Sequence, residues 1–156
     1  MLQRIQSLYL FVIAGLMVAM MFLPLSVLEK GGESYALGVF GVTEAVSSQP
    51  ELIYTVWGLF VLTAVIAIVS VLTIFLYRKR MLQIRLCIFN AIVMIGFYGF
   101  FAFLIYGVMK REISDLSVSI QIALSFPLIG LILDYLAIRN IGADEVLVRS
   151  VERLRK

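Results

Sequence analysis

The chain has 156 residues, 62% of them hydrophobic, and its mean hydropathy is +1.05, which excludes an ordinary water-soluble domain and predicts a single membrane domain. It carries a net charge of +3, no histidine and one cysteine, Cys87, so the commonest metal ligand, the usual proton-transfer group near neutral pH and any internal disulfide are excluded. We therefore expect no catalytic residues, no cofactor and no metal site, and we predict that the protein is not an enzyme.

The apolar residues fall into four blocks, each long enough to cross a hydrocarbon layer that needs about 20 helical residues. The blocks cover residues 5–28, 50–77, 82–109 and 117–138. The first block is longer than the apolar region of a secretory signal and lacks a small-residue cleavage pattern, so it predicts a retained anchor. Short connections make later blocks antiparallel neighbours. The fold class predicted is an all-α membrane protein, a bundle of four transmembrane helices.

The connection between the first two blocks, residues 29–49, predicts a small outer subdomain. Gly31 and Gly32 separate the segments SVLEK and ESYAL, and adjacent glycines suit the two-residue turn of a β-hairpin. We expect a β-hairpin-like outer loop that caps the bundle; a flexible glycine-rich loop and a surface for a partner or ligand are the alternatives. Beyond it, Ser47 or Ser48 is predicted to cap the second helix, with Pro50 in its first turn.

The distribution of basic residues predicts the orientation, because lysine and arginine favour the cytoplasmic side of a membrane. With the N-terminus inside, ten of the 13 basic residues are cytoplasmic: Arg4, Arg78, Lys79, Arg80, Arg85, Arg139, Arg149, Arg153, Arg155 and Lys156. Only Lys30, Lys110 and Arg111 lie outside. Both termini are therefore predicted to be cytoplasmic, and the basic clusters are explained without nucleic acid.

Polar residues within the apolar blocks are candidate site residues, because their burial in a membrane is costly. Asp134 is the acidic one, and Arg85 and Asn90 on the preceding block are expected at a similar depth. The favoured interpretation is an ion pair of Asp134 with Arg85 or Arg139; the alternative is a carboxylate that handles a proton or cation with Asn90 nearby. Pro127 is expected to bend its helix, as proline does in a helix interior.

The charged C-terminal segment is predicted to form a separate amphipathic helix over residues 144–155, after a helix end at Gly142 and with Asp144 as its cap. Its apolar residues share one arc of the helix and form a candidate docking stripe: Leu147, Val148, Val151 and Leu154. A helix this short is marginal alone. The stripe is thus expected to lie on the bilayer interface, the cytoplasmic end of the bundle or a partner.

The two ends of the chain, LQRIQSLYL and LAIRNIGADEVLVRSVERLR, resemble those of a family of small four-span bacterial inner-membrane proteins that is catalogued as a domain of unknown function. The resemblance covers the whole chain and is most specific in the C-terminal segment. It implies a multi-pass protein of the bacterial inner membrane and carries over no catalytic residues.

These observations favour a non-enzymatic membrane subunit or scaffold, in contact with the lipid bilayer and with a protein partner or a second copy through the C-terminal segment or the outer loop. The alternative is a small transporter or channel component that uses Asp134. A hydrated polar path to Asp134 would favour transport, whereas a sealed bundle with an exposed apolar stripe would favour a scaffold.

Overall fold

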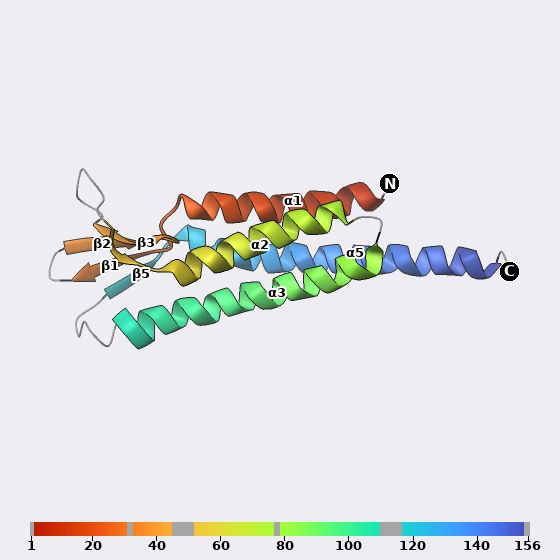
Figure 1. Cartoon of the computed structure of the whole chain (residues 1–156). Coiled ribbons are helices and arrows are strands. Elements are labelled where there is room, and N and C mark those ends of the chain that lie inside the picture. The colour runs from red at the N-terminus through yellow and green to blue at the C-terminus, as the bar shows by residue number, and fades with distance from the viewer. Residues whose placement is uncertain (1, 31–32, 45–51, 77–78, 110–116, 155–156) are drawn as a thin grey trace.

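The computed structural model describes residues 2–30, 33–44, 52–76, 79–109 and 117–154. The molecule is elongated, with a small antiparallel sheet at one end and both termini at the other (Figure 1). Four helices run along its length: α1 (Leu2–Met21), α2 (Trp57–Phe75), α3 (Arg80–Ala102) and α5 (Phe126–Leu154). Each helix packs against its neighbours in the ring α1, α2, α3, α5, so the structure is mostly helical with one common core.

The inner face of each helix follows from the spacing of its buried residues, which alternates between three and four positions as in a left-handed bundle. We call these buried residues the inner stripe. They are Gln6, Leu10, Ile13, Met17 and Met20 on α1; Leu59, Thr63, Ile66, Ser70 and Thr73 on α2; Gln83, Cys87, Asn90, Met94, Phe97 and Phe101 on α3; and Pro127, Gly130, Asp134, Ala137 and Ile141 on α5. Most of these residues are apolar, and their burial holds the helices together.

The sheet has five strands in the order β4-β3-β2-β1-β5. The strands are β1 (Ser26–Lys30), β2 (Glu33–Leu37), β3 (Gly41–Glu44), β4 (Leu52–Thr55) and β5 (Ser117–Ile120), and every neighbouring pair is antiparallel. Lys30 pairs with Glu33, which confirms the hairpin predicted around Gly31 and Gly32. Strand β5 comes from the connection between α3 and α5, so the sheet joins two segments that are far apart in the sequence (Figure 1).

The predicted apolar blocks are too long at three of their ends. α1 ends at Met21, because Pro24 and the pairing of β1 follow it, whereas the prediction continued to residue 28. The second helix starts at Trp57, since Leu52–Thr55 is rich in β-branched and aromatic residues and pairs with β3. The predicted caps Ser47 and Ser48, with Pro50, lie outside the described residues.

The fourth block also differs, because its first residues, Ser117–Ile120, form β5. A 3₁₀ helix, η2 (Ile122–Ser125), then leads into α5, so Pro127 lies in the first turn of α5. Proline fits there because the amide that it lacks has no helical partner. The predicted bend at Pro127 is therefore wrong. The third block agrees more closely: α3 continues into a π-helix, η1 (Phe103–Met109).

The C-terminal segment is part of α5 and not a separate helix. α5 is continuous from Phe126 to Leu154, so Gly142 and Asp144 lie in its interior, and the predicted helix end and cap are wrong. A glycine inside a helix costs about 1 kcal/mol relative to alanine, which the flanking residues of a long helix offset. α5 consequently extends past the ends of the other helices (Figure 1).

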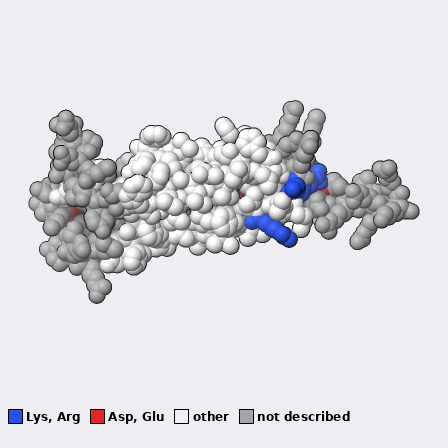
Figure 2. All heavy atoms as spheres, in the orientation of Figure 1, with Lys and Arg blue, Asp and Glu red and all other residues white. Residues whose placement is uncertain are grey.

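The outer surface of the bundle is apolar along its middle. Within the described residues, the segments long and apolar enough to cross a membrane are Trp57–Phe75, Arg80–Gly107 and Ile122–Asp144; Ile5–Met21 is apolar but shorter. Figure 2 shows an uncharged middle region on the face in view, with basic side chains toward the end that carries the N-terminus. Three of the four predicted spans thus have the length and composition of membrane helices.

Candidate functional site

The helical core is polar at one end, toward the termini. Gln6, Ser70, Asn90 and Asp134, one from each helix, are all at least 96% buried. Thr73, Gln83 and Cys87 lie on the same inner stripe in that half of the bundle. In the half nearer the sheet, the inner stripe is apolar except for Thr63, whose hydroxyl donates to the Leu59 carbonyl at 2.8 Å. The buried polar residues of all four helices are therefore gathered in the half of the bundle nearer the termini.

Ser70 and Asn90 link α2 to α3. The Ser70 hydroxyl donates to the Ile66 carbonyl at 2.8 Å, and Asn90 Nδ2 donates to Ser70 Oγ at 3.0 Å. Thr73 likewise donates to the Val69 carbonyl at 2.6 Å. These bonds use the hydroxyl protons of Ser70 and Thr73 within the bundle.

Asp134 is fully buried, and neither of its carboxyl oxygens has a hydrogen bond of good geometry from a described residue. The Cys87 thiol on α3, a weak donor, lies within hydrogen-bonding reach of the carboxyl. Asn90 Oδ1 and Gln6 Nε2 are also buried and unpartnered among the described residues. Buried polar groups are nearly always paired, so this group of side chains is the strongest candidate site in the structure.

The predicted ion pair of Asp134 with Arg85 or Arg139 is wrong, because both arginines are exposed and the carboxyl has no such partner. Arg85 is two residues from Gln83 and from Cys87, which places it about 200° around α3 from the inner stripe. Arg85 and Asp134 therefore do not meet, although the sequence predicted a similar depth in the membrane for both, because Arg85 lies on the outer side of α3. Of the predicted cluster, Asp134 and Asn90 share the core.

Among the described residues, an ion pair joins Arg80 to Asp144, with Nη2 and Oδ2 3.2 Å apart. Arg80 Nη1 also donates to the Asp144 carbonyl at 3.3 Å. Arg80 is the first residue of α3, and Asp144 lies where α5 leaves the bundle. The pair is partly exposed, so it contributes about 1 kcal/mol or less, but it fixes the start of the protruding part of α5.

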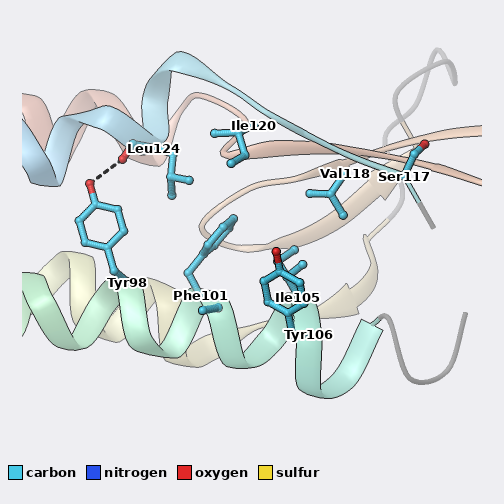
Figure 3. Close-up of a pocket in the computed structure, with 9 residues that line it drawn as sticks. Tyr98, Phe101, Ile105, Tyr106, Ser117, Val118, Ile120 and Leu124 are labelled. Carbon is cyan, nitrogen blue, oxygen red and sulfur yellow. Dashed lines mark hydrogen bonds between the residues drawn. The ribbon is translucent and has the colours of Figure 1, made fainter.

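A cavity of about 620 Å³ lies at the other end of the bundle, between α3 with η1 and the strand β5. Figure 3 shows Tyr98, Phe101, Ile105 and Tyr106 on one side of it and Leu124, Ile120 and Val118 on the other. The Tyr98 hydroxyl donates to the Leu124 carbonyl at 2.7 Å across its inner end. Ser117 Oγ donates to the Glu29 carbonyl at 3.5 Å, and Tyr106 also has a partner.

Most of the side chains that line the cavity are apolar, so its walls suit a hydrocarbon group. A second, smaller cavity of about 260 Å³ lies between the end of α1 and the sheet, lined by residues such as Phe22, Pro24 and Phe40. Neither cavity is lined by Asp134.

The docking stripe predicted in the C-terminal segment lies on the protruding part of α5, and the side chains of Leu147, Val148, Val151 and Leu154 lie outside the described part of the structure. The helix itself gives their register. Continuing the inner-stripe spacing of α5 beyond Ile141 leads to Asp144, Val148 and Val151.

Comparison with known proteins gives a family and no activity. No curated protein matches the chain. A family model described as "Domain of unknown function (DUF4293)" matches residues 2–154, which is nearly the whole chain. The family model covers the ends that suggested the resemblance, apart from Arg155, and everything between them, so the chain belongs to this domain-of-unknown-function family.

Proposed function

We propose that the chain is a four-span protein of the bacterial inner membrane that acts as a non-enzymatic subunit or scaffold, with its C-terminal helix as the docking element. The observation that carries this proposal is the continuous α5, which runs past the bundle to Leu154. Its inward-facing register continues into Val148 and Val151, where no other described element lies beside it (Figure 1). The face of α5 that the other helices cover inside the bundle thus continues along its protruding part, where we propose that a partner covers it.

Four spans require α1 to cross the membrane as well. Its apolar part, Ile5–Met21, is shorter than the other three. α1 nevertheless packs along both α2 and α5, and its full length of 20 residues corresponds to about 30 Å, the thickness of the hydrocarbon layer. The basic residues near Arg80 and the termini then lie on the cytoplasmic side, and the sheet lies outside.

This topology predicts the result of reporter fusions. A reporter that is active only in the cytoplasm should be active when fused after Lys156 and inactive when inserted between Gly31 and Gly32. A reporter that is active only outside should give the opposite pattern. An exterior C-terminus would contradict the proposal.

The scaffold role is tested by the double substitution Leu147→Glu with Leu154→Glu. Full burial of a leucine is worth about 1.5–3 kcal/mol, so loss of two contacts should weaken partner binding by about 100-fold or more. The variant should insert and express normally but lose the protein or second copy that purifies with the wild type in mild detergent.

The matched control is Arg149→Gln with Arg153→Gln, which changes the net charge by the same amount on the opposite side of the helix. It should keep its partner, because exposed charges contribute about 0–1 kcal/mol. Equal binding by the wild type and both variants would show that the stripe is not a docking face.

The alternative, a transporter component that uses Asp134, has one observation in its favour, the unpartnered carboxyl. Transport also needs a path through the bundle. The inner stripe is apolar between Asp134 and the sheet apart from the internally bonded Thr63, and this supports a sealed bundle more than a conduit.

A further inference from the structure

The polar layer around Asp134 has a fixed direction of hydrogen bonding. Ser70 uses its one hydroxyl proton to donate to the Ile66 carbonyl, so Ser70 Oγ can only accept from Asn90. This assigns Nδ2 of Asn90 to the side of Ser70. The Asn90 Oδ1 oxygen is therefore left as an acceptor, and it has no partner among the described residues.

The helix register places Asn90 level with Asp134. Two contacts between the antiparallel helices α3 and α5 fix their relative position: Arg80 with Asp144, and Met94 with Gly130. The distance along the chain from Arg80 to Met94 is fourteen residues, and so is the distance from Gly130 to Asp144, so the two helices stay in step between these contacts. Asn90 lies four residues before Met94, and Asp134 lies four residues after Gly130. Both residues belong to the inner stripe, so their side chains converge on the same layer of the core.

Apart from the weak contact of the Cys87 thiol with the carboxyl, this layer contains three acceptor oxygens without a hydrogen bond of good geometry, Asn90 Oδ1 and both oxygens of Asp134. An ionised carboxylate buried without partners is strongly disfavoured, whereas a protonated carboxyl has a hydrogen to donate. We propose that Asp134, Asn90 and Ser70 form a proton-binding site, in which the Asp134 carboxyl holds a proton and donates it in a hydrogen bond to Asn90 Oδ1. One proton thereby completes a chain of hydrogen bonds from Asp134 through Asn90 and Ser70 to the backbone of α2.

Within the part of the chain whose side chains the structure describes, the groups that face Asp134 from the neighbouring helices supply no compensating positive charge. On α3 the titratable neighbour is Cys87, a weak donor, and Arg85 points away. α2 has no titratable residue. On α1, Ile13 lies next to Gly130, which makes the half-buried Tyr9 level with Asp134 and Gln6 about one turn farther toward the termini.

A proton fits this layer better than a metal cation does. Hard cations take about six or more oxygen ligands, and the layer offers three open ones from two side chains. Gln6 Nε2 is an unpartnered donor about one turn away, so it is placed to stabilise the carboxylate when the proton leaves.

Exchange of this proton is one-sided. Gln6, Thr73 and Gln83 are buried polar residues between Asp134 and the end of the bundle that carries Arg80. In the other direction the next residues are Ile13, Met94 and Phe97, which are fully buried and apolar. The proton should therefore equilibrate with the side of the membrane that carries the termini.

The experiment is infrared spectroscopy of the full-length protein in lipid nanodiscs. The wild type should show the C=O stretch of a protonated carboxyl at neutral pH, and Asp134→Asn should lack it. The exposed carboxyl variant Glu29→Gln is the matched control and should keep the band. Asn90→Leu should shift the band, because the carboxyl loses its acceptor.

Thermal unfolding gives a second measurement. Since the native state holds a proton that the unfolded state releases, the melting temperature of the wild type should fall as the pH rises. Asp134→Asn, whose amide can still donate to Asn90, should melt at a temperature that depends less on pH. A band absent from the wild type, or an equal pH dependence in both proteins, would overturn the proposal. If added sodium raised the melting temperature of the wild type but not of Asp134→Asn, the site would bind a cation and the proton proposal would be overturned.

The side of exchange is tested in vesicles whose inner and outer pH are set separately. The band of oriented protein should follow the pH on the side of the termini, and a band that follows the side of the sheet would overturn one-sided access. These measurements do not depend on the docking stripe, so their failure would leave the scaffold proposal standing.

Discussion

The substitution Gly130→Leu is expected to destabilise the bundle by about 1–3 kcal/mol, because it overfills the contact between α5, α3 and α1. A Cβ at Gly130 would already lie 3.1 Å from Met94 Cε and 3.8 Å from Ile13 Cγ2. Small residues allow helices in membranes to approach closely, and Gly130 is the position where three inner stripes meet. The expected result is a lower melting temperature of the purified protein in nanodiscs.

The matched control for Gly130 is Gly96→Leu on α3. A side chain at Gly96 would meet no atom within 4 Å, and the position is exposed. This variant should melt at or above the wild-type temperature, because leucine has the higher helix propensity. Adding Met94→Ala to Gly130→Leu should recover part of the loss, since it removes the side chain that clashes. Equal melting temperatures for the two leucine variants would show that the helices do not pack at Gly130.

The substitution Gly58→Leu is expected to cost a similar amount, about 1–3 kcal/mol, at the contact between α2 and α3. A side chain at Gly58, in the first turn of α2, would collide with the ring of Phe100 on α3. The half-buried ring would then have to turn outward and leave its contact with the core. The measurement is again thermal unfolding in nanodiscs.

Combining Gly58→Leu with Phe100→Ala distinguishes this clash from a defect in α2 itself. If the collision is the cause, the double variant should be more stable than the sum of the two single effects predicts. Strict additivity would mean that Gly58 matters for another reason. Gly99→Leu, on the same helix as Phe100 but with open space around it, is the control and should leave the melting temperature unchanged or higher.

The long apolar helices and the hairpin could be predicted from the sequence because each depends on neighbouring residues. Three blocks have the length and hydropathy of membrane helices, and the glycine pair between SVLEK and ESYAL sets the pairing of β1 with β2. The remaining sheet could not be predicted in this way. The segment Ser117–Ile120 is strand β5 because β1 lies beside it, and a sequence window does not contain that partner.

The members of the candidate site could be predicted from the sequence in part, but their partners on other helices could not. Asp134 and Asn90 stand out as polar residues in apolar blocks, but depth alone suggested Arg85 as the partner of Asp134. The rotation of Arg85 away from the core follows from the spacing of Gln83, Cys87 and Asn90. The same spacing on α2, from Leu59 through Ser70, was the signal that could have identified Ser70 as an inward-facing member of the polar layer.

The position of β5 in the sheet has a consequence for synthesis of the protein. β1 has β2 on one side and β5 on the other, so it becomes an interior strand only when Ser117–Ile120 has been made and has paired with it. Until then β1 has an unpaired edge, which is the kind of surface that attracts other strands. Because only the short helix η2 separates β5 from α5, the sheet can close before the last long helix has been made. A chain whose β5 does not reach β1 keeps that edge open to strands of other chains.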